Sequence, residues 1–224
     1  MSTNAIVLDA VGLSFPNSKS FVSAIKNLVS KSNDDFKALK NINLTVQTGE
    51  VFGLIGKNGS GKSTILRIIA GIYAADSGIC KIRGSTSLLA GLGTGFSQHQ
   101  TGVENALLYG SILGHTEAEM RKLLPEIIKF SELGDFIHKP LRTYSAGMKA
   151  RLGLAVASAI CPDILLIDEV LGVGDPQFRE KSKQRILELV KKTGTVVIVS
   201  HSFALMKEIC DRIGVIHKGK LEMV

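Results

Sequence analysis

Alternating apolar and polar positions near the N-terminus predict two half-buried strands. The alternation covers Ala5 to Ala10 and Ile42 to Val46. Together these segments predict a small antiparallel sheet. Between them, residues 17–37 hold apolar side chains at helical spacing among lysines, which predicts an inserted amphipathic helix. Such a helix either covers a membrane or partner surface or packs on its own domain.

The rest of the chain alternates between strand and helix patterns, with a helical region in the middle. Thr101 with Glu104 and Thr116 with Glu119 form capping-box patterns, so we expect helices to begin there, within a largely helical lobe from about residue 91 to 144. Strand patterns cover residues 51–55, 78–84, 87–90, 164–167, 195–199 and 213–217, and residues 176–192 predict a helix. The uninterrupted runs of strand-favouring residues at 164–167 and 195–199 are typical of parallel strands buried on both faces. We therefore expect an α/β core with a helical insert.

Composition agrees with a folded domain and excludes several classes of protein. The chain has 224 residues, 45% hydrophobic residues and a formal charge of +7. That charge suits nucleic acid, an anionic membrane surface or an anionic nucleotide, and does not choose among them. The three cysteines are far apart and form no CxxC, so neither a disulfide framework nor a zinc site is indicated. No segment predicts a signal peptide or a spanning helix.

A glycine-rich turn between a strand and a helix is the strongest chemical signal. Residues 56–63, GKNGSGKS, fit the phosphate-loop pattern, in which backbone N–H groups and a helix N-terminus point at a polyphosphate. Lys62 would reach the β- and γ-phosphates, and the Ser63 hydroxyl would bind Mg²⁺. The alternative is a glycine-rich turn without a ligand. The nucleotide-binding candidates are Gly56, Lys57, Asn58, Gly59, Ser60, Gly61, Lys62, Ser63 and Thr64.

Two carboxylates and a histidine follow buried strands further along the chain. Asp168 suits the Walker B role of supporting Mg²⁺, and Glu169 can orient or deprotonate the attacking water. His201 follows the next strand pattern, and we expect it to contact the γ-phosphate. The alternatives are helix-capping carboxylates and a structural histidine. We take Glu169, His201 and Lys62 as the catalytic candidates.

The stretch YSAGM, residues 144–148, precedes an alanine- and glycine-rich helix pattern. Ser145 is its expected N-cap. A serine, a small residue and Gly147 at a helix start can bind phosphate, although an ordinary capped helix has the same pattern.

Taken together, these motifs resemble the nucleotide-binding subunit of an ABC transporter. YSAGM occupies the place of that family's LSGGQ signature, and GKNGSGKS, ILLIDE and VSH match its Walker A, Walker B and H-loop. The resemblance spans nearly the whole chain. It implies a single ATP-binding domain over residues 1–224, with a RecA-like P-loop NTPase core, an N-terminal antiparallel β subdomain and a helical signature subdomain.

The resemblance also implies a shared nucleotide site. In this family two domains form a head-to-tail dimer, and each nucleotide lies between the Walker motifs of one subunit and the signature of the other. Ser145, Ala146 and Gly147 would then act in trans, with Asp175 as the D-loop aspartate and Phe15 stacked on adenine. ATP and Mg²⁺ are the implied cofactors, with Ser63 and Asp168 on the metal.

Departures from the family pattern narrow the resemblance to one branch. The segment between Phe15 and Gly56 is longer than usual, and phrases such as LLAGLGTGF, TGVEN and DEVLGVGD resemble subunits that export O-antigen polysaccharide, capsular polysaccharide and teichoic acid. Some O-antigen members have a further carbohydrate-binding domain, which is either absent here or removed by truncation. In the Q-loop, Ser97 stands where many members have glutamine, with Gln98 beside it, so either or neither serves that role.

The function implied is ATP hydrolysis driving a lipid-linked polysaccharide or teichoic acid through a separate integral membrane subunit. We expect a homodimer of ATPase subunits, peripheral on the cytoplasmic face of the inner or plasma membrane, with no nucleic acid as partner. The alternatives are a soluble ABC-type ATPase acting on nucleic acid or ribosomes, and a nucleotide-gated interaction module with little turnover.

Overall fold

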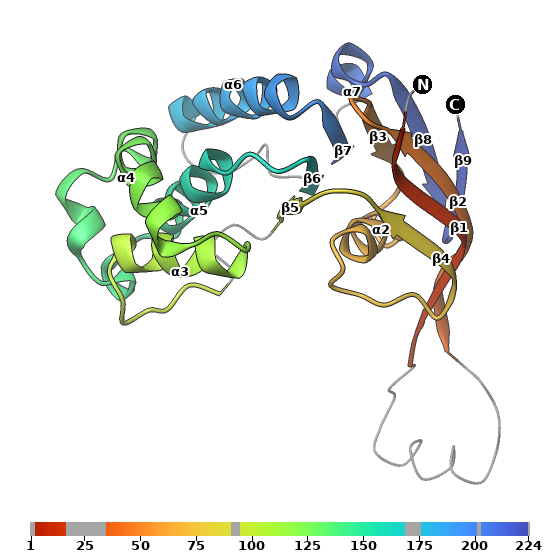
Figure 1. Cartoon of the computed structure of the whole chain (residues 1–224), viewed down its shortest axis with the longest axis horizontal. Coiled ribbons are helices and arrows are strands. Elements are labelled where there is room, and N and C mark those ends of the chain that lie inside the picture. Colours follow the sequence, from red (N-terminus) through yellow and green to blue (C-terminus); the bar gives the residue numbers. More distant parts are fainter. Residues whose placement is uncertain (1–2, 17–34, 91–94, 169–175, 201–202, 224) are drawn as a thin grey trace, which may run out of the picture. The chain divides into compact units, whose positions relative to one another are not determined.

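A computed structural model of the chain describes residues 3–16, 35–90, 95–168, 176–200 and 203–223 (Figure 1). The chain forms two compact units. The first comprises residues 1–83 and 199–224, and the second comprises residues 84–198.

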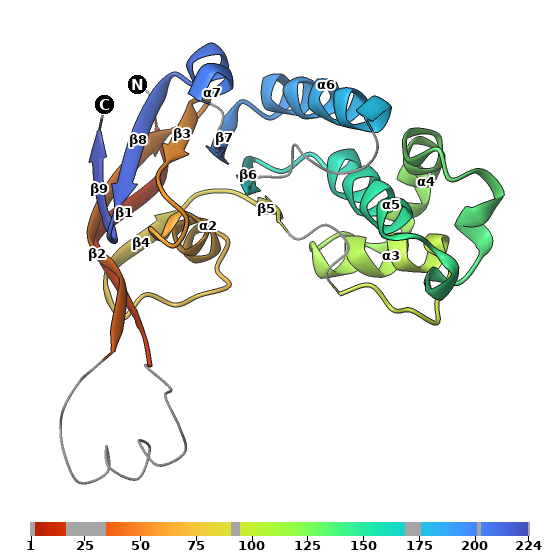
Figure 2. The same cartoon turned by 180° about the vertical axis from the view of Figure 1, so that it is seen from behind.

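The first unit contains an antiparallel sheet with strand order β2-β1-β4 (Figure 2). Its strands are β1 (Asn4–Phe15), β2 (Phe36–Gln47) and β4 (Ser77–Ile82). Alternate residues of β2, among them Ile42, Leu44 and Val46, are buried, as the apolar alternation predicts. The predicted antiparallel sheet is therefore confirmed. Phe36 and Lys37 belong to β2 and not to the inserted segment, and the remaining predicted helix, residues 17–34, lies outside the described residues.

The first unit also holds the strands that surround the phosphate-loop pattern. Strand β3 (Val51–Ile55) pairs in parallel with β8 (Arg212–His217), and β8 pairs antiparallel with β9 (Lys220–Met223). Helices α2 (Lys62–Ile69) and α7 (Phe203–Ile209) complete it. The sequence predicted the strand at residues 213–217, which is part of β8, but not β9. The two residues between β8 and β9 are Lys218 and Gly219. Both turn residues have left-handed φ angles, 47° and 78°, as in a two-residue hairpin that returns the chain alongside β8.

The second unit contains strands β5 (Thr86–Leu89), β6 (Ile164–Asp168) and β7 (Thr195–Val199) in that order, the last residue of β7 falling at the unit boundary. Strand β6 pairs in parallel with β5, which confirms the parallel strand predicted at residues 164–167. Ile164 to Ile167 are fully buried and β7 is buried along its length, which explains their lack of alternation.

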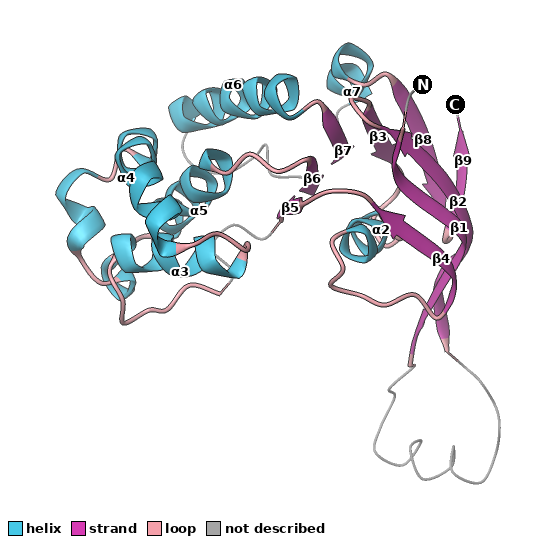
Figure 3. Ribbon diagram, in the orientation of Figure 1, coloured by secondary structure: helices cyan, strands magenta, loops and turns pink. Residues whose placement is uncertain are grey.

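Helices make up most of the second unit (Figure 3). They are α3 (Gly102–Ile112), α4 (Glu117–Ser131), α5 (Ala146–Ala159) and α6 (Pro176–Thr193), with 3₁₀ turns at Gly134–His138 and Leu141–Thr143. Both predicted capping boxes are present: Thr101 and Thr116 each accept from the backbone N–H three residues on, while Glu104 and Glu119 bond back. These reciprocal bonds begin α3 and α4 where the sequence predicts.

An ion-pair cluster joins three of these helices. The Glu132 carboxylate, at the C-cap of α4, accepts from Arg151 on α5 at 3.2 Å and from Lys181 on α6. Phe130 and Phe178 are in ring contact beside it, with centroids 5.8 Å apart. Within the described ranges, no helix is long and apolar enough to cross a membrane.

Candidate functional site

The phosphate-loop pattern folds as a strand, a tight loop and a helix. Strand β3 ends at Ile55 and α2 begins at Lys62, with Gly61 as its N-cap. Glycine has no side chain to cap the first-turn amides, and the first turn contains no acidic residue. The amides and the positive end of the helix dipole are thus left for an anion. Ser63 and Thr64 lie in this first turn, both half-buried.

Lys62 holds its ammonium group inside the loop. The side chain is buried, and Nζ donates to the carbonyls of Gly56 at 2.7 Å and of Lys57 at 3.1 Å. These two hydrogen bonds hold the end of the lysine side chain at the helix start. Lys57, Asn58 and Gly59 are exposed around it. This arrangement supplies positive charge and amide donors to a polyphosphate.

The loop packs against strand ends that come from distant parts of the sequence. A Cβ on Gly56 would lie 2.3 Å from the Ile216 carbonyl of β8, so only glycine fits. The Gly219 amide, in the turn after β8, donates to the Ser60 carbonyl at 3.0 Å. The Gly219 carbonyl in turn accepts from the Lys40 amide on β2 at 2.7 Å. The loop is thus braced from both sheets of this unit.

Ser60 tests the fit of a phosphate group. Its side-chain hydroxyl is buried, and among the described residues it has no hydrogen-bond partner. A buried hydroxyl costs free energy unless it is paired, and a phosphate oxygen is a strong acceptor. The orphaned hydroxyl, the uncapped helix start and the buried ammonium of Lys62 all suit a nucleotide polyphosphate.

Phe15, the candidate for adenine stacking, ends β1. Its ring is half-buried and makes an edge contact with Tyr73, with centroids 5.7 Å apart. The Arg67 guanidinium, on α2, lies 5.7 Å from the Tyr73 ring. Phe15 therefore lies in an aromatic–cation cluster built on the helix that follows the phosphate loop.

The signature stretch forms the start of α5 in the second unit. Ser145 is the N-cap, as expected, and its Oγ accepts from the Met148 amide at 3.2 Å. Ser145 and Ala146 are exposed and Gly147 is half-buried. Among the described residues, a Cβ on Gly147 would have only the Ser145 hydroxyl within contact range, at 3.8 Å. The start of α5 is therefore open at these positions within the described part of the chain.

The two Q-loop candidates have different surroundings. The Ser97 backbone is bound on both sides by Asn105, a fully buried residue of α3. The Gln98 side chain accepts through Oε1 from Lys149 Nζ at 2.8 Å, and Lys149 lies in the first turn of α5. Asp168 ends β6 half-buried. Glu169, Asp175 and His201 lie outside the described residues.

Comparison with known proteins agrees with this geometry. The family model described as "ABC transporter" matches residues 39–172, more than half of the chain. The chain belongs to the ABC transporter family. The ABC fold is likewise present in a solved dimeric ATP-binding cassette, MJ0796, in a post-hydrolysis state with ADP and phosphate: TM-score 0.75, 25% identity, 97% of this chain and 96% of that chain covered.

Curated ABC relatives include surface-polymer exporters. The chain is 48% identical over 187 residues to the O-antigen export system ATP-binding protein RfbB of Myxococcus xanthus, covering 84% of this chain and 43% of that protein. It is 42% identical over 209 residues to the teichoic acids export ATP-binding protein TagH of Levilactobacillus brevis, covering 92% and 58%. The chain thus spans about half the length of these two relatives.

The sequence analysis did not identify four residues that support the site in this ABC domain. Tyr73 and Gly219 support the phosphate-loop unit, while Asn105 and Lys149 support the signature unit. Asn105 had a usable signal, because asparagine is unfavourable inside a helix unless its amide is bonded. The other three have no local signal, since their partners are distant in sequence.

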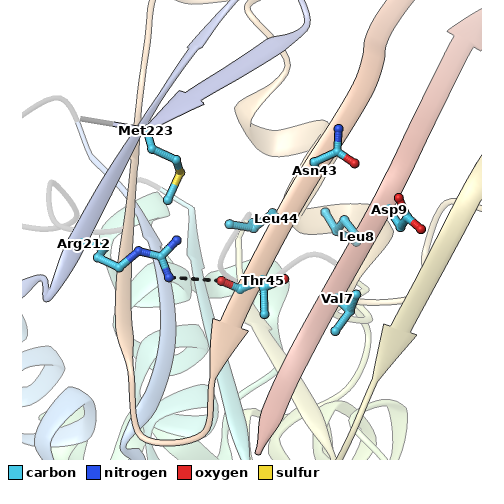
Figure 4. Close-up of a pocket in the computed structure, with 8 residues that line it drawn as sticks. All are labelled: Val7, Leu8, Asp9, Asn43, Leu44, Thr45, Arg212 and Met223. Atoms are coloured by element: carbon cyan, nitrogen blue, oxygen red, sulfur yellow. Dashed lines mark hydrogen bonds between the residues drawn. The ribbon is translucent and has the colours of Figure 1, made fainter. Parts of the chain in front are cut away.

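A pocket of about 400 Å³ lies elsewhere in the first unit (Figure 4). It lies between β1 and β2 and the strands β8 and β9, where Arg212 donates to the Thr45 carbonyl at 3.2 Å. Its lining residues are Val7, Leu8, Asp9, Asn43, Leu44, Thr45, Arg212 and Met223. None belongs to the phosphate loop, so this pocket is distinct from the nucleotide site.

Proposed function

We propose that the chain is the ATP-hydrolysing part of an exporter for a lipid-linked cell-surface polysaccharide of O-antigen or capsule type, or for teichoic acid. The observation that carries the proposal is the buried Lys62 ammonium at an uncapped helix start, within a braced phosphate loop. The names of the relatives, O-antigen and teichoic acids export proteins, support the substrate class. In this proposal the chain forms one ATP-binding domain, because the positions that match the family's motifs lie along its whole length.

In this proposal each motif has a chemical role. The loop amides and Lys62 bind the phosphates, and the Phe15 cluster meets the adenine. Ser63 and Asp168 hold Mg²⁺, which neutralises charge on the phosphates when bound. Glu169 orients or deprotonates the attacking water, and His201 contacts the γ-phosphate. The half-buried Asp168 at a strand end suits a metal-supporting carboxylate.

A second copy completes the site in this proposal. Ser145, Ala146 and Gly147 of the second copy, with its Asp175, would contact the nucleotide held by the first. The open start of α5 supports that role, because its N-terminal dipole and exposed serine favour a phosphate. The dimeric cassette MJ0796 is a structural precedent.

The membrane subunit is a separate chain in this proposal, and the ATPase is peripheral on the cytoplasmic face of the membrane. Exposed apolar side chains of the helical unit, Leu108, Ile112 and Phe136, offer it a contact surface. ATP-driven closure of the dimer would then shift the conformation of the membrane subunit.

Two variants test the proposal. Lys62→Met is expected to abolish binding of a fluorescent ATP analogue. Glu169→Gln is expected to retain binding, to lower kcat by at least about a hundredfold and to accumulate as an ATP-bound dimer in size-exclusion chromatography. Undiminished hydrolysis by Glu169→Gln would remove that residue as the base. Export is tested in a strain that lacks the ATPase gene. The unaltered chain is expected to restore polymer at the cell surface, and Glu169→Gln is expected not to restore it.

A further inference from the structure

The loop that follows Gly95 is bonded to the segment that leads into the signature helix. The Arg142 amide donates to the Gln98 carbonyl and the Leu141 amide donates to the Gln100 carbonyl, both at 2.9 Å. Thr101 and Pro140 form an isolated antiparallel bridge beside them. Backbone bonds of this kind hold two segments in one register. The loop and the approach to α5 therefore form one small ladder.

Asn105 fixes the loop from the inside. Its side chain is fully buried, Oδ1 accepts from the Ser97 amide at 2.7 Å, and Nδ2 donates to the carbonyls of Ser97 at 3.0 Å and Thr101 at 2.9 Å. A third carbonyl, of Gln100, lies 3.2 Å from Nδ2. A buried amide satisfied in this way permits few other loop conformations. The loop is thus anchored to α3 at one end.

Gln98 extends from this anchored loop to the signature helix. Its Oε1 accepts from Lys149 Nζ at 2.8 Å, and the Lys149 amide donates to the Ser145 carbonyl at 3.1 Å. Lys149 therefore lies one helical turn after the N-cap Ser145. Because the amide of Gln98 is directed to Lys149, the side chain is engaged within its own unit.

We propose that Gln98 is a positioning residue for the signature helix: through Lys149 it fixes the orientation of Ser145 toward the nucleotide held by a second copy of the chain. Gln98 then makes no contact with the nucleotide of its own subunit. This inference rests on the proposed function, in which Ser145 acts in trans. The proposal predicts that the signature helix moves when the loop that carries Gln98 is displaced.

A double-mutant cycle tests the link in the Glu169→Gln background, where ATP-bound dimers accumulate. Gln98→Leu and Lys149→Met are each expected to raise the ATP concentration for half-maximal dimerisation severalfold, and the double variant no further than either single one. Gln98→Glu retains an acceptor for Lys149 and is expected to restore dimerisation. Binding of a fluorescent ATP analogue to the monomer is expected to stay unchanged in all four.

Matched controls address loop and charge effects. His99→Ala alters the exposed neighbour of Gln98 in the same loop, and Lys191→Met removes an exposed lysine from α6. Neither is expected to change dimerisation. If both controls matched the test variants, the effect would come from general surface charge or loop disturbance and the inference would be wrong.

Steady-state kinetics of the same variants, made without Glu169→Gln, distinguish the positioning role of Gln98 from a direct role at the nucleotide of its own subunit. If Gln98 contacted water or Mg²⁺ at its own site, its replacement would lower kcat at saturating ATP, while Lys149→Met would not. Independent, additive effects of the two replacements would likewise overturn the inference. Ser145→Arg distinguishes the proposals: normal dimerisation of that variant would refute the trans arrangement, whereas blocked dimerisation without any Gln98–Lys149 coupling would refute only the positioning role.

Discussion

Gly219 donates its backbone N–H to the Ser60 carbonyl at 3.0 Å, so the turn after β8 holds the phosphate loop in place. The two residues are far apart in sequence, and Ser60 belongs to the loop that surrounds the Lys62 ammonium. The nucleotide site of this chain therefore depends on the last hairpin that the structure describes.

Gly219→Ala is expected to weaken ATP binding about tenfold. The new Cβ would lie 2.5 Å from the Ala38 carbonyl, which forces the turn away from Ser60. Titration with a fluorescent ATP analogue measures the change. Gly49→Ala is the matched control, because Gly49 also has a positive φ, 86°, but its Cβ would have no described atom within 4 Å. Similar affinity loss in both variants would assign the effect to backbone strain alone.

Asn105→Leu is expected to lower the free energy of unfolding by about 2–4 kcal/mol, because it leaves the Ser97 amide and several loop carbonyls without their buried partner. Urea unfolding followed by circular dichroism measures it. Ser111→Ala removes one exposed hydroxyl bond on the same helix and should cost less than about 0.5 kcal/mol. A loss below about 1 kcal/mol for Asn105→Leu would show that water replaces the amide.

Glu132→Ala is expected to lower the free energy of unfolding by about 1 kcal/mol, since it removes the half-exposed carboxylate that pairs with Arg151 and Lys181. Glu132 has a left-handed φ of 55°, so Glu132→Gly relieves backbone strain while removing the same ion pairs. The glycine variant should thus be close to the unaltered chain in stability. Thermal unfolding at low and high salt compares the two, and equal losses that salt does not reduce would count against the ion-pair role.

Cys210 predicts a loss of stability at alkaline pH. Burial, and secondarily the charge of Asp211, raise the pKa of the thiol to about 12 from an ordinary value of 9.0. The folded chain thus holds the thiol proton that the unfolded chain releases. This contribution to stability is complete below pH 9 and is lost progressively as pH rises from 9 through 12.

The measurement is urea unfolding at pH 8 and pH 10. With Cys210 fully buried, the free energy of unfolding would fall by about 1.4 kcal/mol between these two pH values. Partial exposure of Cys210 reduces the expected fall to about 1 kcal/mol or less. Cys210→Ala lacks the thiol, so the difference between the two chains isolates this group from lysines and tyrosines. The same pH dependence in both chains would contradict the assignment.

The sequence was sufficient to predict the elements whose patterns are local. The alternation along β2, the capping boxes at Thr101 and Thr116, and the strand–loop–helix order around Lys62 all follow from residues within a few positions of one another. Their periods and spacings are set by backbone geometry, so they can be recognised without the fold. Strand β9 was missed because four residues are too few for a period to emerge.

The roles of particular side chains required tertiary structure. Sequence alone left open whether Ser97, Gln98 or neither serves the Q-loop role. The structure bonds the first through its backbone to Asn105 and the second through its side chain to Lys149. Gly219 likewise pairs with Ser60 across a long stretch of chain. Periodicity therefore determined the α/β class, and motif spacing determined the phosphate loop, because both are local properties of the chain. Only the packing of distant segments decided which groups brace the loop, since a hydrogen bond depends on the position of both partners and the sequence specifies one at a time.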